Sequence, residues 1–507
     1  MTDQRIRNIV IVGGGSAGWM TAAALAKTLG RECSIRLVES EEIGIIRVGE
    51  ATVPHLSVFN KVLGIDEADF VRQTMGTFKL GVQFVDWQKP GKSYVHGFGT
   101  MIGLDVGMLP FHHYWLRARQ AGQAGDIGDY SLNTLAAPRG KFMVSAIDAP
   151  ANTPLANIAY AYHFDTGLYG RYLRRQAESM GVQRTEGKVC DTVLRPHDGF
   201  VDAIVMESGE VIQADLFIDC SGLRGLLIEQ ALHTGYEDWG HWLPTDRAVT
   251  VGCEAVGPPT PYTRATAQAA GWQWRIALQH RVGNGHVYAG RYLSDDEAAA
   301  TLLHNLDGRA TGDPRLIRFR AGTRKQAWNR NVVAIGLSSG FLEPLESTGI
   351  FLIQSAVMRL LNLFPQKDFS QALIDRYNAQ SRFEIERIRD FLILHFHATE
   401  RDDTPFWRYC RTMDIPDSLR SVMALFRESG QFIRNADELF GLVSWVQVML
   451  GQGVIPQHYH PIADQMPEPE LRHLMDHVKQ VIGACVDAMP PHQAFIDRYC
   501  AAPALAS

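Results

Sequence analysis

The start of the chain constrains the fold most, because a glycine-rich turn lies between an apolar strand and a helix. The residues from Arg7 to Val12 are predicted to form a short buried parallel strand, and helix-forming residues follow from Met20 to Ala26. A second strand is expected from Ser34 to Val38. The chain is therefore predicted to open with a Rossmann-like β-α-β unit.

The turn itself matches GxGxxG, the pattern of dinucleotide-binding sites. Its first glycine permits the tight turn, its second lets the backbone approach a pyrophosphate, and its third allows the helix to pack closely. An acid at the end of the second strand is placed to accept hydrogen bonds from a ribose. The residues expected to bind the cofactor here are Gly13, Gly15, Ser16, Ala17, Gly18 and Glu39. A tight turn with nothing bound is the alternative.

Later segments favour FAD over a nicotinamide cofactor, a choice that the glycine turn alone does not make. Gly187-Lys188-Val189 has the pattern of an edge strand that reaches an adenine. Asp219-Cys220-Ser221-Gly222 and Ala334-Ile335-Gly336-Leu337 are predicted to supply two more close backbone approaches. Several such approaches fit a long, two-part cofactor.

Charge and cysteine usage exclude several classes of protein. The net charge is -6 and the basic residues are scattered, so neither a nucleic acid nor an anionic membrane is an expected partner. The seven cysteines are far apart and form no CxxC pair, which favours reduced thiols, a cytoplasmic location and no metal. Glycines interrupt the apolar stretch from Ile9 to Ala26, which argues against a signal peptide or a membrane span.

The rest of the chain is predicted to complete one large α/β body. A half-exposed strand is expected over Phe78 to Trp87, with Lys79 on the face opposite Phe78, and further strands over Val211 to Cys220 and Asn331 to Ile335. The stretch from Arg247 to Ser294 favours a second β-rich layer, and the chain is mainly helical from Ile350. We expect an FAD-binding body over residues 1–365 and a helical subdomain over residues 366–507 that covers the substrate pocket.

Three long motifs resemble signatures of the flavin-dependent tryptophan halogenase family. They are Gly49-Glu50-Ala51-Thr52-Val53-Pro54, Phe78-Lys79-Leu80-Gly81 and the run from Phe341 to Ile350. The resemblance extends from near residue 8 to roughly residue 455. It implies a flavoprotein-monooxygenase-like fold, in which a Rossmann-like FAD body carries a second β-rich layer and a helical C-terminal subdomain.

The resemblance also implies a role for individual residues. Lys79 matches the lysine that holds the oxidised halogen, as hypohalous acid or a haloamine, and Glu346 matches the carboxylate beside the reacting ring. Thr348 and Gly349 match the backbone that binds halide. Ala51, Leu337 and Ile350 match residues that flank the isoalloxazine, and His96 and Phe98 match residues that sandwich the substrate ring. Val189 is expected to approach the adenine, and Trp445 is expected to form an aromatic wall of the substrate pocket.

Physical chemistry agrees with these roles. Ile350 to Leu363 is predicted to be an apolar helix, so Thr348 and Gly349 lie at its N-terminus, where free N–H groups and the macrodipole favour an anion. A lysine beside Phe78 and Leu80 is expected to lose hydration, which lowers its pKa. Taken singly, Lys79 reads as a surface lysine, Glu346 as a helix cap and His96 as a core histidine.

Two departures from the family pattern concern the flavin block and the substrate. The family pattern Trp-x-Trp-x-Ile-Pro here reads Trp272-Gln273-Trp274-Arg275-Ile276-Ala277, which removes one fixed φ angle. The tyrosine pair that clamps tryptophan is absent from the segment from Leu439 to Gln447. Because a zwitterion needs fixed partners once it is desolvated, the preferred substrate is predicted to be indole or another neutral aromatic.

The expected reaction is chlorination or bromination of an electron-rich aromatic ring with reduced FAD, oxygen and a halide. No second GxGxxG is evident, which favours a separate reductase as the source of reduced flavin. A single-component flavin monooxygenase and a non-catalytic flavin-binding protein are the alternatives. A homodimer is left open, and the sequence names neither the natural substrate, the halide, the ring position nor the reductase.

Overall fold

The computed structural model describes residues 3–42, 49–99, 102–146, 153–435 and 437–503. A mostly parallel sheet forms the nucleotide-binding half, with the strand order β20-β21-β12-β1-β2-β8. Its strands are β1 (Asn8–Val12), β2 (Ser34–Glu39), β8 (Gln183–Glu186), β12 (Leu216–Asp219), β20 (Trp328–Asn329) and β21 (Val332–Ala334). Only the short edge strand β20 runs antiparallel to its neighbour.

Helices cover this sheet, and β1 is buried on both of its faces. Ile9 and Ile11 belong to the main hydrophobic core, whereas Val10 and Val12 belong to a second core cluster on the other side. A strand that is covered on both sides needs an unbroken apolar run, which is why residues 9–12 are all β-branched. The packed helices include α1 (Ser16–Leu29), α6 (Thr166–Ser179) and α8 (Gly349–Asn362). The predicted strand-turn-helix opening is confirmed.

A seven-stranded sheet forms the second layer, in the order β18-β14-β17-β16-β15-β5-β6. Its strands are β5 (Gly81–Val85), β6 (Ser93–Gly97), β14 (Arg247–Cys253), β15 (Thr263–Gln268), β16 (Gly271–Ala277), β17 (Val282–Tyr288) and β18 (Arg315–Arg318). The β-rich character predicted for residues 247–294 is confirmed. Helix α7 (Asp295–His304) packs on β14 and β17.

Three small sheets contain the other strands in the described part of the chain. Strands β3 (Gly49–Ala51), β7 (Ala161–Asp165) and β4 (Thr77–Lys79) form one of them, and this sheet lies between the two halves. The others contain β9 (Val189–Leu194), β10 (Val201–Met206) and β11 (Val211–Gln213), and β13 (Tyr236–Asp238), β19 (Gly322–Arg324) and β22 (Gly340–Phe341). The predicted strand over residues 211–220 was wrong in one respect, because it is divided between β11 and β12.

The strand predicted over residues 78–87 was also wrong, because two strands in different sheets occupy this range. Strand β4 ends at Lys79 and β5 begins at Gly81, and between them the Leu80 N–H donates to the Pro261 carbonyl at 2.7 Å. The expected half-exposure was wrong too, since Phe78, Lys79 and Leu80 are all buried. The chain passes from one sheet to another at this point, and side chains on both faces of the strand are buried. The Lys79 side chain therefore does not reach solvent.

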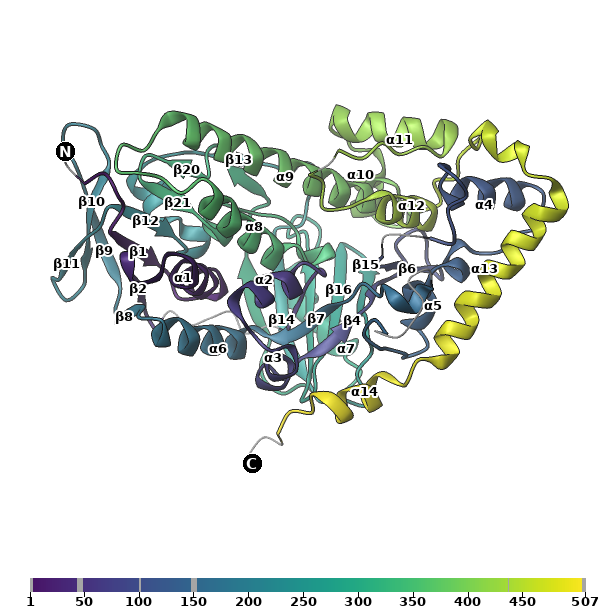
Figure 1. Cartoon of the computed structure of the whole chain (residues 1–507), viewed down its shortest axis with the longest axis horizontal. Coiled ribbons are helices and arrows are strands. Elements are labelled where there is room, and N and C mark those ends of the chain that lie inside the picture. Colours follow the sequence, from purple (N-terminus) through teal and green to yellow (C-terminus); the bar gives the residue numbers. More distant parts are fainter. Residues whose placement is uncertain (1–2, 43–48, 100–101, 147–152, 436, 504–507) are drawn as a thin grey trace.

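The chain after Leu363 is helical and extends over one end of the molecule (Figure 1). The long helix α9 runs beside α8, and α13, coloured yellow, follows the outer edge past α4 and α5 down to α14. The bounds in this part are α9 (Gln371–His397), α10 (Pro405–Thr412), α11 (Asp417–Ser429), α12 (Leu442–Gly451), α13 (Glu468–Ala488) and α14 (His492–Tyr499). The remaining helices are α2 (Leu56–Leu63), α3 (Glu67–Gln73), α4 (Phe111–Gln120) and α5 (Leu132–Ala136). The predicted helical character is confirmed.

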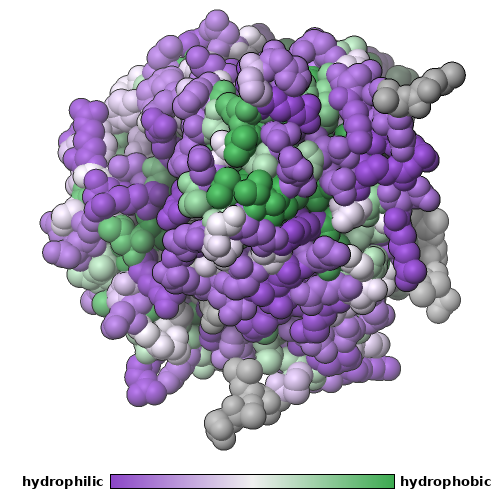
Figure 2. Space-filling model, turned by 90° about the vertical axis from the view of Figure 1, so that its left-hand side faces the viewer, coloured by the Kyte–Doolittle hydropathy of each residue, from purple (hydrophilic) through white to green (hydrophobic). Residues whose placement is uncertain are grey.

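The face seen in Figure 2 is mainly hydrophilic, with hydrophobic residues gathered in patches, one of them in the upper middle of the face. Within the described ranges, no helix has both the length and the apolar character needed to cross a bilayer.

The last helix is hydrogen-bonded to the strand that carries Lys79. The buried His492 accepts from the Phe78 N–H through Nε2 at 3.2 Å, and its Nδ1 lies 2.8 Å from the Pro259 carbonyl. Since a carbonyl only accepts, Nδ1 carries the proton and Nε2 is the free acceptor. Burial lowers the pKa of His492 to about 4, although the Pro259 carbonyl opposes this, so the ring stays neutral at working pH.

We expect His492→Ala to lower the free energy of unfolding by about 1–3 kcal/mol, because the buried Phe78 N–H loses its acceptor. Thermal unfolding measures the effect. His477→Ala, on the exposed face of α13, is the control and should leave the free energy of unfolding unchanged. Equal stability of the two variants would contradict the anchoring role.

Candidate functional site

Lys79 lies at the end of β4 with its side chain fully buried. Its Nζ donates to the Thr52 carbonyl at 3.1 Å and to the Ser347 hydroxyl at 2.9 Å. The ammonium group also lies 5.2 Å from the centre of the Phe98 ring. The amine therefore faces a small polar site that has an aromatic wall.

Burial lowers the pKa of Lys79 to about 7, while the Glu346 and Glu50 carboxylates oppose the shift. Charged and neutral amine therefore coexist near neutral pH. The neutral form has a lone pair that can bind an electrophile, and the charged form is a strong hydrogen-bond donor in a dry site.

Glu346 ends the short helix η7 (Pro344–Glu346) and is buried between two histidines. His96 Nδ1 lies 2.9 Å from Oε1 and 3.0 Å from Oε2, and His395 Nε2 lies 2.9 Å from Oε1. Burial by itself raises the pKa of Glu346, but the two histidines outweigh it and bring the pKa to about 2. Glu346 is therefore a buried carboxylate anion over the working pH range.

A left-handed turn at Ser347 joins the carboxylate to the lysine. Ser347 has φ of +60°, which is uncommon for a residue with a side chain, and it is buried. This conformation follows Glu346 directly and presents the Ser347 hydroxyl to Lys79. Lys79 and Glu346 are the predicted catalytic residues, and they are 267 positions apart in the sequence. The fold thus brings them into one site.

Aromatic rings surround this site, and two of them were missed from the sequence. His96 lies 6.4 Å from Phe98, as centroid distances, and also 5.7 Å from Phe391 and 6.2 Å from Phe440. Phe391 and Phe440 stack at 4.0 Å. Phe440 belongs to the segment that was inspected for a substrate clamp, so its aromatic character was the available signal.

The structure places Trp445 behind these rings. Trp445 meets the edge of Phe391 at 5.0 Å and stacks on Phe432 at 5.2 Å. It lines a small enclosed cavity, whose other lining residues are Arg387, Ile388, Glu438, Leu439 and Phe440. Trp445 therefore forms the outer wall of the aromatic region, and no ring contact with His96 is recorded for it among the described residues.

Two charged side chains of this cavity were also missed from the sequence. Arg387 forms an ion pair with Asp390 at 2.9 Å, and Glu438 accepts from the Asn435 amide at 2.6 Å. Each charged group therefore has a partner within the protein, but Nε of Arg387 is buried without a hydrogen-bond partner among the described residues.

The N-terminus of α8 has the features of an anion site. Thr348 is its N-cap and makes no side-chain capping hydrogen bond, and a Cβ added at Gly349 would meet no atom within 4 Å. The first amides of the helix are thus not blocked by a side chain, which suits a halide or a flavin oxygen. Nearby, Ile350 is buried and Leu337 is 37% exposed.

The glycine turn fits the pyrophosphate of a dinucleotide. A Cβ at Gly13 would lie 2.2 Å from the Cys220 carbonyl oxygen, and one at Gly18 would lie 1.8 Å from the Gly13 carbonyl oxygen, so the turn admits no larger residue there. Gly15 is the N-cap of α1, and a Cβ on it would meet nothing within 4 Å. Ser16 and Ala17 open the helix behind it. Backbone amides at this helix end are therefore open to a phosphate.

Glu39 lies over the glycine turn at the end of β2. Its Oε1 accepts from Arg184 Nε at 2.6 Å, and its Oε2 accepts from the Trp19 indole at 3.3 Å. The Gly187 N–H donates to the Glu39 carbonyl at 2.8 Å, and β9 begins two residues later at Val189. The predicted ribose and adenine residues are therefore neighbours. Ala51, by contrast, lies in β3, which belongs to the same small sheet as the strand β4 that carries Lys79.

Glu343, one turn before Glu346, is a second buried acid with a different charge. Its Oε2 lies 2.7 Å from the Thr245 hydroxyl oxygen, and its Oε1 accepts from the Trp272 indole N–H. Burial raises the pKa of Glu343 to about 8, although the Thr245 hydroxyl opposes the shift. Glu343 is therefore mainly neutral at pH 7.

We expect Glu343→Gln to keep the free energy of unfolding within about 1 kcal/mol of the wild type at pH 5, because an amide replaces a neutral acid. The pKa of Glu343 is 4.5 in the unfolded chain and about 8 in the folded chain, so between these pH values the folded chain binds more protons. The free energy of unfolding of the wild type therefore falls as pH rises from 4.5 to about 8. The glutamine does not titrate, so the free energy of unfolding of the variant should rise relative to that of the wild type as pH approaches 8. Denaturant unfolding at several pH values measures it, and a constant difference would contradict a neutral Glu343.

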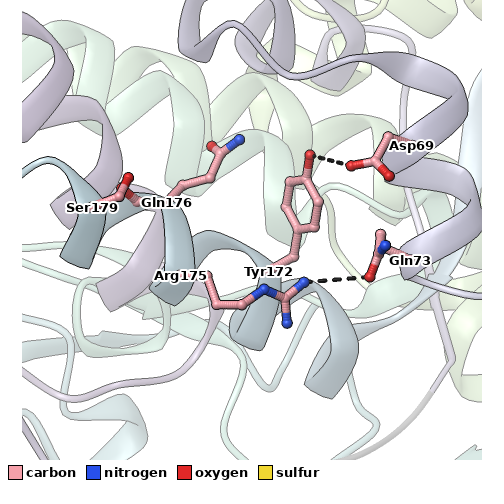
Figure 3. Close-up of a pocket in the computed structure, with 6 residues that line it drawn as sticks. All are labelled: Asp69, Gln73, Tyr172, Arg175, Gln176 and Ser179. Atoms are coloured by element: carbon pink, nitrogen blue, oxygen red, sulfur yellow. Dashed lines mark hydrogen bonds between the residues drawn. The ribbon is translucent and has the colours of Figure 1, made fainter.

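A shallow hollow lies elsewhere on the surface, between α3 and α6 (Figure 3). Tyr172 donates to Asp69 at 3.0 Å across it, and Arg175 donates to Gln73 at 3.4 Å. These polar groups pair with one another, as in ordinary helix packing. The hollow includes neither Lys79 nor Glu346.

Comparisons with known proteins agree on one family. The profile of the tryptophan halogenase family matches residues 8–468. The tryptophan 6-halogenase ThaL of Streptomyces albogriseolus is 34% identical over 96% of this chain and 97% of its own. Two solved structures cover 99% of this chain and all of their own: Xcc4156, a flavin-dependent halogenase from Xanthomonas campestris (50% identity, TM-score 0.96), and BrvH, a flavin-dependent halogenase from Brevundimonas sp. BAL3 (45% identity, TM-score 0.94).

Proposed function

This chain belongs to the tryptophan halogenase family, and from that premise we propose how its own residues carry out halogenation. It is an FAD-dependent enzyme that halogenates an aromatic substrate. Family membership decides against both a hydroxylating monooxygenase and a non-catalytic flavin protein. The observation that carries the proposal is the shared burial of Lys79 and Glu346 in one site.

The glycine turn and the end of β2 are the proposed FAD site. Gly13, Gly15 and Gly18 leave room for a pyrophosphate beside the amides of α1, and Glu39 accepts from the ribose. Leu337, Ile350 and Ala51 flank the ring system. Reduced FAD, when bound, would supply the two electrons that reduce oxygen to the peroxide level, and this oxidant would take two electrons from the halide ion to give hypohalous acid.

The N-terminus of α8 is the proposed halide site, where the Thr348 and Gly349 amides donate to the anion. Lys79 is proposed to receive the oxidised halogen as hypohalous acid. Its ammonium form donates a hydrogen bond to the oxygen. Its neutral form attacks the halogen, so that an N–halogen bond forms, the O–halogen bond breaks, and hydroxide takes a proton from nitrogen and leaves as water. The Thr52 carbonyl and the Ser347 hydroxyl hold Nζ in place for this step.

Glu346 is proposed to act on the ring that is attacked. Its negative charge stabilises the positive ring formed when halogen adds, because little water is present to screen the charge. The carboxylate then takes the proton from the halogenated carbon, which restores aromaticity. His96 and Phe98, with Phe391 and Phe440, are proposed to hold the ring.

We further propose that the preferred substrate is a neutral aromatic such as indole, with reduced flavin supplied by a separate reductase. The support is the aromatic wall around Glu346 and the lack of a tyrosine pair in the segment from Leu439 to Gln447.

We expect kcat/KM for indole to exceed that for free tryptophan by at least about 10-fold, because burial of unpartnered charged ends is costly. The measurement is product mass and rate with reductase, NADH, FAD and bromide. Omission of the reductase should stop turnover. A preference for tryptophan would overturn the neutral-substrate proposal, and NADH oxidation by the chain alone would overturn the need for a reductase.

A further inference from the structure

His395 lies on α9 with its ring fully buried beside Glu346. Its Nδ1 lies 2.8 Å from the Phe391 carbonyl, one turn earlier on the same helix. A carbonyl only accepts hydrogen bonds, so Nδ1 carries a proton. The protonation of one of the two ring nitrogens is thus settled by the helix itself.

The other nitrogen faces the carboxylate. Nε2 of His395 lies 2.9 Å from Glu346 Oε1, in a close ion-pair contact rather than a linear hydrogen bond. If this nitrogen had no proton, its electron-rich edge would lie 2.9 Å from an anionic oxygen in a buried site, where repulsion is poorly screened. A proton on Nε2 removes the repulsion and makes the ring an imidazolium.

Packing holds the ring in this orientation. His395 lies 4.9 Å from Phe84, 6.3 Å from Trp87 and 5.0 Å from Phe391, as centroid distances. The Gln452 amide also donates to the His395 carbonyl at 2.7 Å. The ring therefore has a fixed place within an aromatic cluster, and it fixes one oxygen of Glu346 in turn.

We propose that His395 is a positioning residue for Glu346, an imidazolium whose charge keeps the carboxylate ionised and correctly turned toward the substrate. This rests on the proposed function of Glu346. His96 and Tyr94 on β6 and Lys79 on β4 also influence this carboxylate, but His395 is the group that approaches Oε1 from the helical side.

Two variants separate charge and donation from packing. His395→Phe keeps an aromatic ring in the cluster and removes both nitrogens, and we expect kcat to fall by about 100-fold with KM nearly unchanged. His395→Gln keeps a donor near the Nε2 position, and its kcat should be about 10-fold above that of the Phe variant. Wild-type kcat in His395→Phe would overturn the proposal, as would equal losses in both variants.

The protonation itself is measured by NMR of protein labelled with ¹⁵N-histidine, with the His395 signals assigned from their absence in His395→Phe. We expect both ring nitrogens to carry protons at neutral pH, and Nε2 to lose its proton in Glu346→Gln. A wild-type ring protonated at Nδ1 alone would overturn the proposal even if a variant failed to fold. This measurement needs no turnover. It therefore tests the protonation of His395 even if the proposed function of Glu346 is wrong.

Discussion

Replacement of Lys79 with methionine is expected to lower halogenated product by about 10³-fold or more, since the group proposed to hold the oxidised halogen is lost. Oxidation of reduced flavin should continue, because Lys79 donates only to Thr52 and Ser347 among the described groups. Product is measured by mass spectrometry, and flavin oxidation is followed by absorbance. Normal bromination by the variant would end the proposed role of the lysine.

The same substitution should stabilise the protein, because a buried amine is replaced by an apolar chain of similar length. The pKa of Lys79 is 10.5 in the unfolded chain and about 7 when folded. Between these values the unfolded chain binds more protons, so the stability contributed by this group rises with pH. The gain from Lys79→Met should be largest below pH 7 and vanish above 10.5. Lys141→Met, which removes a lysine bound to the Met489 carbonyl outside the site, is the control and should retain activity.

Replacement of Glu346 with glutamine is expected to lower kcat by about 10²- to 10³-fold while KM changes little. The amide keeps the shape of the side chain, but it cannot stabilise a positive ring or accept its proton. Steady-state kinetics with the preferred aromatic measure the effect. The pKa of Glu346, about 2 when folded and 4.5 unfolded, means that its contribution to stability is full above 4.5 and is lost as pH falls toward 2.

Glu343→Gln is the matched control for this experiment. Both acids are buried on the same short stretch, but Glu343 is mainly neutral at pH 7 and contacts Thr245 and Trp272 rather than the histidines. It should retain kcat at pH 7. If the two variants lost activity equally, disturbance of the local backbone would explain both, and a specific role for the Glu346 charge would be wrong.

Much of the nucleotide-binding half was predictable from local pattern. The apolar run at residues 9–12 and the glycine turn each report a structure formed by neighbours in the sequence. The fold class and the family were likewise confirmed, since long motifs are specific. The division at residues 365 and 366 stays a prediction.

The sequence was a poor guide wherever a contact depends on distant segments. The chain leaves one sheet at Leu80, whose N–H donates to the carbonyl of the distant Pro261, and nothing near Leu80 in the sequence indicates this contact. His395 reads as a core histidine on an apolar helix face until Glu346 is placed beside it. Phe440 is one aromatic among many until it stacks on Phe391. Such pairings become visible only in three dimensions.

The hydrogen bond between His492 and the Phe78 N–H has a consequence for biosynthesis. The two partners are 414 positions apart, so this long stretch of chain must leave the ribosome after Phe78 before the contact can form. Until then β4, the strand that carries Lys79, lacks the hydrogen bond from the Phe78 N–H to His492. A nascent chain can thus assemble its cofactor half first, yet its reaction centre is fully braced only after α14 has left the ribosome.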